Sequence, residues 1–219
     1  MSTAIATRED EWELEALVAS FASGEEPPPD ATHWAPDVGP CVTVVLFASY
    51  ASPFAAAAER AVTGALGGIA RARLVRRHFV DPRRRVAALL GAELAEAARA
   101  QGRFLAAHEA LLARGGALEG LSVERFASDV GLCAAEVVRE LASHRPRLRV
   151  ARDQWHARRL GVLFAPTCLL DGREYEGDWR EVEVEGRVRD RLAELDATHD
   201  FRRHPTLPCA PTSMRVPRP

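Results

Sequence analysis

The segment 42–66 constrains the fold most, because it predicts a buried strand that leads through a short turn into a helix. The run Val-Thr-Val-Val-Leu-Phe-Ala (42–48) is apolar and β-branched, as expected of a strand inside a sheet. Alanine-rich sequence from about Pro53 to Leu66 follows the pattern of a helix. Serine caps free backbone amides and proline fits the first helical position. We therefore expect Ser52 to be the N-cap of this helix.

The following sequence predicts further strands on either side of a long helical block. An alternating pattern over 72–79 predicts a strand, and helical periodicity covers about 84–160. The last strands form a hairpin around Asp171-Gly172, because Asp-Gly between apolar runs is a strong signal for a two-residue turn. A closing helix is expected over 180–195. This order predicts an α/β fold with a helical insertion.

Segments of different composition flank the predicted domain, which covers 41–196. Residues 1–23 predict an amphipathic helical arm, and residues 24–40 contain Glu-Glu-Pro-Pro-Pro-Asp and predict a linker. Residues 197–219 form a proline-rich tail that we expect to be disordered. The arm is expected to dock on its own domain or on a partner, and it offers a route to a homo-oligomer.

The composition narrows the classes of partner and cofactor. The net charge is −2, so no excess of basic residues favours nucleic acid or an anionic membrane. We find neither a secretory leader nor an apolar run of ~18–20 residues, and we expect a cytoplasmic protein. Four cysteines lie far apart without the spacing of a zinc site, so we expect free thiols and no metal: Cys41, Cys133, Cys168 and Cys209.

Several segments, taken in order, resemble the DsbA-like branch of the thioredoxin superfamily from about His33 to Leu195. The matching segments are the strand and turn 42–55, the strand end 75–79, the helical segments 95–112 and 121–132, and Phe-Ala-Pro-Thr-Cys-Leu-Leu-Asp-Gly-Arg-Glu-Tyr-Glu-Gly (164–177). The resemblance implies a thioredoxin-like α/β fold with a helical insertion, an active-site turn after the first strand, and a cis bond before Pro166.

The chain departs from this family where the family carries Cys-Pro-x-Cys. Here the motif reads Ser-Pro-Phe-Ala, with Ser52 and Ala55 at the cysteine positions. Disulfide exchange needs a thiolate and a second thiol, so we expect a redox-inactive protein. The resemblance still implies a groove beside the cis-proline that binds a peptide or protein partner. Its expected lining is Tyr50, Ser52, Pro53, Phe54, Ala165, Pro166 and Thr167.

Two other functions remain open at this stage. Kappa-class glutathione transferases and chromene-carboxylate isomerases share the fold and carry Ser-Pro-Tyr at this turn, which makes Ser52 a candidate catalytic residue that holds a glutathione thiolate. Glutathione is then the one candidate cofactor. A single-cysteine oxidoreductase could instead use Cys168, although a buried apolar cysteine is the simpler interpretation.

Other ionisable residues in the helical block and the second strand have simpler structural interpretations. His78 and His108 occupy positions typical of the family, and we expect structural roles for them. Glu93 and Glu96 lie three residues apart on one predicted helix, where we expect a solvated face.

Overall fold

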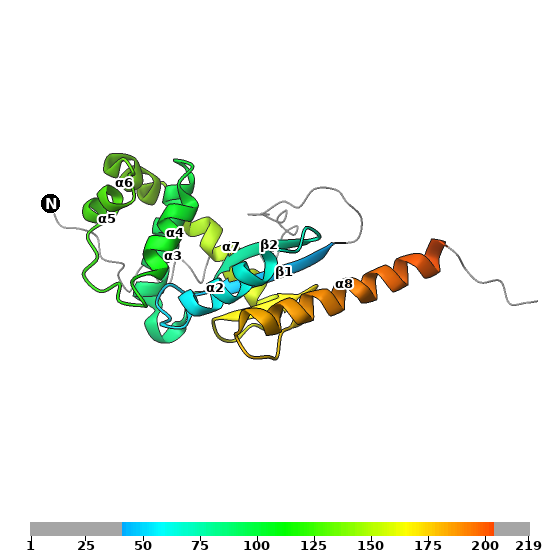
Figure 1. Cartoon of the computed structure of the whole chain (residues 1–219). Helices are drawn as coiled ribbons and strands as arrows, with labels where there is room; N and C mark the ends of the chain where they lie inside the picture. Colours follow the sequence, from blue (N-terminus) through cyan, green and yellow to red (C-terminus); the bar gives the residue numbers. More distant parts are fainter. Residues whose placement is uncertain (1–40, 204–219) are drawn as a thin grey trace, which may run out of the picture.

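The computed structural model describes residues 41–203, with side chains as far as residue 198 (Figure 1). The predicted arm 1–23, the linker 24–40 and Cys209 lie outside these residues.

A four-stranded mixed sheet forms the centre of the domain. Its strands are β1 (Val42–Ala48), β2 (Ala72–His78), β3 (Thr167–Leu170) and β4 (Arg173–Glu174), in the order β2-β1-β3-β4. The two central strands of this order differ in direction, because β1 is parallel to β2 and antiparallel to β3. β4 covers only the second half of β3, where it pairs with Leu169 and Leu170.

The predicted Asp-Gly turn is present between β3 and β4. Asp171 and Gly172 have φ values of 48° and 82°, the two positive angles that a tight hairpin turn requires. The Asp171 carboxylate also accepts a hydrogen bond from the backbone N–H of Thr43 at 2.8 Å and another from Arg191 Nε at 2.9 Å.

Helices cover both faces of the sheet. Helices α2 (Ala55–Leu66) and α8 (Glu181–Arg203) pack on one face, and α7 (Arg145–Arg159) packs on the other. Alternation along β1 supplies both cores, because Val44 and Leu46 face α2 and α8 while Phe47 faces α7.

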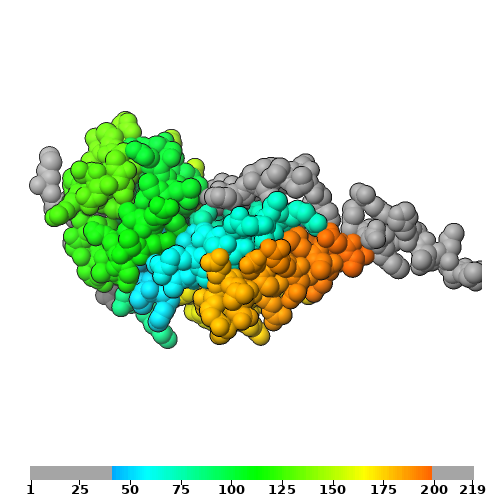
Figure 2. Space-filling view, in the orientation of Figure 1, coloured from blue at the N-terminus to red at the C-terminus, as the bar shows by residue number. Residues whose placement is uncertain are grey.

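The helical insertion connects β2 to β3 and forms a lobe at one end of the sheet (Figure 2). It contains the 3₁₀ turn Pro82–Arg84 and the helices α3 (Arg85–Arg99), α4 (Phe104–Leu112), α5 (Val123–Asp129), α6 (Ala134–Ala142) and α7. Ser122 caps α5 by accepting from the N–H of Arg125. Gly91 of α3 allows close packing, since a Cβ there would lie 2.9 Å from both Tyr50 Cβ and Leu118 Cδ1.

Two predicted helix boundaries are wrong. α2 begins at Ala55, so Ser52 is not its N-cap, because residues 49–52 are held in a separate turn by the Ser52 N–H bonded to the Ser49 carbonyl. α8 continues to Arg203, seven residues into the segment assigned to the proline-rich tail, since no proline interrupts it before Pro205. No helix among residues 41–203 has the length and apolar character needed to span a membrane.

Candidate binding edge and buried polar network

The turn after β1 and the segment before β3 meet at one end of the sheet. β1 and β3 are antiparallel and Phe47 pairs with Thr167, so the chain leaving β1 lies beside the chain entering β3. The bond between Ala165 and Pro166 is cis. We call residues 52–54 and 163–166 together the turn edge.

Large apolar side chains are exposed along the turn edge. Phe54 is 68% exposed, Leu163 83% and Phe164 61%. Pro53 is also exposed, and Ala165 and Pro166 are half-buried. Isolated apolar side chains on a surface are ordinary, but several at one end of a sheet are typical of an interaction site.

Three residues expected to line the groove are buried instead. Tyr50 is only 3% exposed because it points into the helical insertion, and it therefore does not line the surface. Thr167 is buried and its Oγ1 donates to the Phe164 carbonyl at 2.9 Å. Ser52 is 9% exposed, and its Oγ accepts from the Phe54 N–H at 3.3 Å, so the hydroxyl turns back on the chain.

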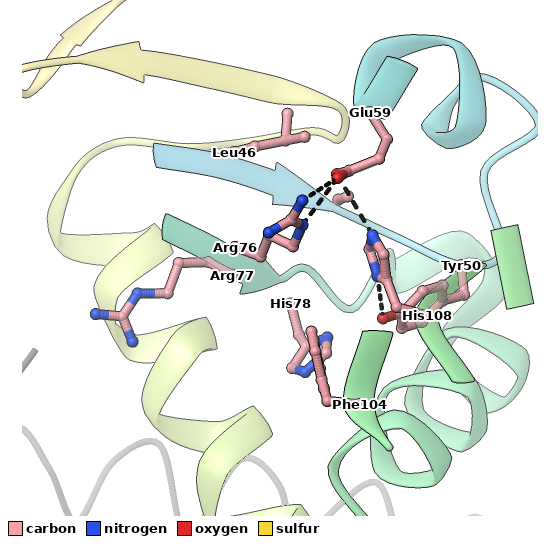
Figure 3. A pocket seen from close by; sticks show the side chains of 9 residues that line it. Leu46, Tyr50, Glu59, Arg76, Arg77, His78, Phe104 and His108 are labelled. Carbon is pink, nitrogen blue, oxygen red and sulfur yellow. Dashed lines mark hydrogen bonds and ion pairs between the residues drawn. The ribbon is translucent and has the colours of Figure 1, made fainter. Parts of the chain in front are cut away.

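A buried polar network lies beneath the turn (Figure 3). The Tyr50 hydroxyl shares a 2.7 Å hydrogen bond with His108 Nδ1, and His108 Nε2 lies 3.4 Å from Glu59 Oε2. Arg76 on β2 forms an ion pair with Glu59 at 2.6 Å. These groups surround a cavity of about 10 Å³, room for about one water molecule.

Ionisation in this network follows from its contacts. Burial raises the pKa of Tyr50 well above its ordinary value, and the Glu96 and Glu59 carboxylates raise it further. Burial alone would raise the pKa of Glu59, but the contacts with His108 and Arg76 lower it below its ordinary value. The network therefore holds Tyr50 as a neutral phenol and Glu59 as a carboxylate at neutral pH.

The prediction that Glu93 and Glu96 lie on a solvated face of α3 is wrong, because both residues are buried. Glu96 lies 2.9 Å from His78 Nε2 and 2.8 Å from Arg99 Nε, and Glu93 forms an ion pair with Arg147. The structural roles expected for the two histidines agree with these contacts. One sequence signal was present: the two carboxylates interrupt an alanine- and leucine-rich stretch that is otherwise suited to burial on all sides.

No group of three or more histidine, cysteine or acidic side chains within residues 41–203 is arranged to hold a metal ion.

A family model described as Thioredoxin matches residues 39–189. The chain belongs to the thioredoxin family. Among solved structures, a thioredoxin-like oxidoreductase from Silicibacter pomeroyi is 25% identical, with a TM-score of 0.60 and coverage of 76% of this chain and 94% of that one. The oxidoreductase DsbA from Xylella fastidiosa is 17% identical, with a TM-score of 0.59 and coverage of 80% and 100%. The second match concerns the fold alone: this thioredoxin-family chain shares with a DsbA the thioredoxin-like α/β fold that carries a helical insertion.

Curated relatives of this thioredoxin-family chain carry another name. The Na(+)/H(+) antiporter NhaA 3 of Salinispora tropica is 33% identical over 138 residues, which are 63% of this chain and 21% of that protein. The NhaA antiporter of Nitrosospira multiformis is 34% identical over 140 residues, with coverage of 63% and 22%. The match thus spans about a fifth of the length of these relatives.

Cys168 is placed where a thiol in a thioredoxin fold has little reactivity. It is 1% exposed in the core under α2 and α8, and burial raises its pKa to about 12. A thiol with this pKa is almost entirely protonated at neutral pH, while the attacking species in disulfide exchange is the thiolate. The surroundings of Cys168 therefore argue against a single-cysteine oxidoreductase that uses this thiol.

Proposed function

We propose that this chain is a redox-inactive DsbA-like domain that binds an extended, apolar segment of a partner protein at the turn edge. The observation that carries the proposal is the exposure of Phe54 and Phe164 beside a turn whose cysteine positions hold Ser52 and Ala55.

The chemistry of the turn supports the redox-inactive part. A serine hydroxyl has no accessible anionic form at neutral pH without a strong base, and Ser52 Oγ contacts a backbone amide rather than a base. Ala55 has no group to resolve a mixed disulfide. Cys168, the only cysteine on β3, is buried and protonated.

The sheet supports the binding part. On one side, β3 pairs with β1 as far as Thr167. On the other side, its ladder with β4 includes only Leu169 and Leu170. The last contact on that side is the Cys168 carbonyl, which accepts from the Tyr175 N–H at 2.8 Å, so no strand among the described residues continues along the outer side of 165–167. An extended peptide can add here by backbone hydrogen bonds, while Phe54 and Phe164 contact its apolar side chains.

Peptide selection tests the binding site. Linear peptides selected from a phage-displayed library on the purified chain are synthesised, and their affinities are measured by fluorescence anisotropy. Phe54→Asp and Phe164→Asp should each weaken binding about tenfold, as expected for aromatic anchors. Val138→Asp is the matched control, because Val138 is 48% exposed on α6, away from the turn edge. Equal losses in all three variants, or none, would refute the site.

Redox and glutathione assays test the remaining parts. Insulin reduction by dithiothreitol should proceed at the same rate with and without the chain, and faster reduction in its presence would refute redox inactivity.

Calorimetry of the chain with millimolar glutathione should show no binding. Binding that disappears in Ser52→Ala would replace the proposal with a glutathione-dependent enzyme.

A more specific partner is suggested by the curated relatives. Because those relatives are named as NhaA antiporters and the match covers a fifth of their length, we propose an NhaA-type antiporter as the protein that this domain serves. The detergent-solubilised antiporter of the same organism should bind the chain saturably in microscale thermophoresis. Loss of binding in Phe164→Asp, with Val138→Asp unaffected, would assign that contact to the turn edge, and absence of binding to the native chain would exclude this partner.

A further inference from the structure

A second surface of the domain, distinct from the turn edge, combines an apolar floor with a basic rim. It is a pocket of about 470 Å³ between the start of α3 and the loop before α5. Its floor contains Val86, Leu90, Leu118 and Leu121. We call it the arginine-rimmed pocket.

The rim carries three consecutive arginines. Arg83, Arg84 and Arg85 line the pocket, and Glu119 is the one acidic residue among its lining residues. Arg83 and Arg84 are exposed. The start of α3 adds to this positive potential, because its first turn has no acidic residue and its N-cap makes no side-chain hydrogen bond. The pocket therefore suits an occupant that presents apolar side chains together with carboxylates.

A segment of this chain outside the described residues has that composition. Leu14, Leu17, Val18 and Phe21 have the i, i+3, i+4, i+7 spacing of one helical face. Five acidic residues lie in or just before this stretch: Glu9, Asp10, Glu11, Glu13 and Glu15. Apolar side chains match the floor, and the carboxylates match the arginines.

The connection to the domain is long enough. Residues 24–40 separate this segment from the start of β1 and can span up to about 55 Å when extended. The pocket lies toward the far end of β1, since Arg84 Nη1 donates to the carbonyl of Ala51 at 3.0 Å, just after that strand. A seven-residue strand is about 23 Å long, well within this reach.

We propose that residues 9–22 dock on the arginine-rimmed pocket of their own domain, with Leu14, Leu17, Val18 and Phe21 on the floor and the carboxylates against Arg83 and its neighbours. This occupant is favoured over a separate partner because it is acidic and apolar in the required combination and is tethered to the same chain.

Photo-crosslinking of the full chain tests the placement. p-Benzoylphenylalanine replaces Leu17, and crosslinked peptides are identified by mass spectrometry in a mixture of ¹⁴N- and ¹⁵N-labelled protein. Crosslinks to residues 82–90 or 118–121 with a single isotope are expected. Mixed-isotope crosslinks would overturn docking within one chain in favour of exchange between copies, and crosslinks elsewhere would overturn the pocket.

Charge exchange tests the ion pairs without depending on one variant. Arg83→Glu should lower the crosslink yield roughly threefold, as expected when favourable surface pairs become repulsive. Glu11→Arg with Glu15→Arg should do the same, and combining all three should restore the yield. Arg173→Glu, an exposed arginine on β4, is the control and should leave it unchanged. An unchanged yield in Arg83→Glu, or no restoration in the combination, would refute the pairing.

Discussion

The hydroxyl oxygen of Tyr50 lies 2.7 Å from Nδ1 of His108, and this buried contact joins the turn after β1 to helix α4 of the insertion. Both residues are nearly inaccessible to solvent, at 3% and 4% exposure. A polar bond in such a place holds two parts of the fold in one arrangement, because burial keeps both groups away from bulk water.

Tyr50→Phe should therefore lower the free energy of unfolding by about 1–3 kcal/mol, since it leaves a buried histidine nitrogen without a partner. Urea denaturation followed by circular dichroism measures the change. Tyr175→Phe is the matched control: its hydroxyl donates to the Asp178 carbonyl at 2.7 Å in a less buried setting, where water can replace it. A loss as large in the control would contradict the special role of the Tyr50 contact.

Glu96 should make stability fall in acid. Burial would raise its pKa, but hydrogen bonds from His78 and Arg99 lower it well below its ordinary value of 4.5. Because the pKa is lower in the folded state, the contribution of Glu96 is fully present above about pH 4.5 and is lost as the pH falls further.

Glu96→Gln should lower the free energy of unfolding by roughly 3–5 kcal/mol at pH 7, since it removes a buried carboxylate that is hydrogen-bonded to His78 and Arg99. It should also flatten the decline of the unfolding free energy below about pH 4.5. Urea titrations at several pH values compare it with Glu174→Gln, a change at an exposed residue. If the unfolding free energy of Glu96→Gln declines as steeply below about pH 4.5 as that of the native chain, other carboxylates cause the loss of stability in acid.

Placing cysteines at positions 52 and 55 of the turn should create a disulfide. Ser52 and Ala55 lie one turn apart, with the Ala55 N–H 3.3 Å from the Ser52 carbonyl, and the start of α2 lowers the pKa of a thiol placed there. Ser52→Cys with Ala55→Cys should oxidise internally in glutathione disulfide, while Ser52→Cys alone should form a mixed disulfide. Peptide mapping distinguishes these products, and two reduced thiols in the double variant would show that the geometry is unsuitable.

The native cysteines should differ in reactivity. Cys133 is exposed, whereas Cys168 is buried with its pKa raised to about 12. Iodoacetamide at pH 8 should label Cys133 in the folded protein and Cys168 only after unfolding in urea. Labelling at equal rates, measured by mass spectrometry of the tryptic peptides, would place Cys168 nearer the surface than its surroundings imply.

Replacing a helical glycine by alanine should change the stability in opposite directions at two positions. At Gly91 a Cβ would meet Tyr50 and Leu118 at 2.9 Å. Gly91→Ala should therefore lower the free energy of unfolding by about 1–3 kcal/mol through overpacking, despite the better helix propensity of alanine. At Gly186 in α8 no atom outside the adjoining helix backbone and the two chain neighbours lies within 4 Å of an added Cβ, so alanine should raise the free energy of unfolding by about 0.5–1 kcal/mol. Thermal melts compare the two, and stabilisation by Gly91→Ala would contradict the close packing.

Local signals made much of the fold predictable. Asp171-Gly172 encodes both positive φ angles of its turn, and Ser122 supplies the cap of α5 within three residues. The start of α2 was missed because Ser52-Pro53 favours a helix locally, while the backbone of 49–52 closes a turn of its own.

The partners of Glu93 and His108 could not be predicted because they are distant in sequence. Glu93 pairs with Arg147, 54 residues away, and His108 bonds to Tyr50, 58 residues away. Similarly, nothing local distinguishes the buried Tyr50 from the exposed Phe54, since both are aromatic residues of one short turn. Only the position of the helical insertion decides which of them faces inward.

The carboxylate of Asp171 holds the first strand and the last helix at once, through Thr43 and Arg191. The same carboxylate therefore links both segments to the turn between β3 and β4. A pull applied to the two ends of the described segment, residues 41 and 203, enters the domain through β1 and α8, and at Asp171 both are tied to the hairpin between β3 and β4. Tension is thereby distributed over three segments instead of peeling one from the sheet, so a single turn residue contributes to how the domain withstands force.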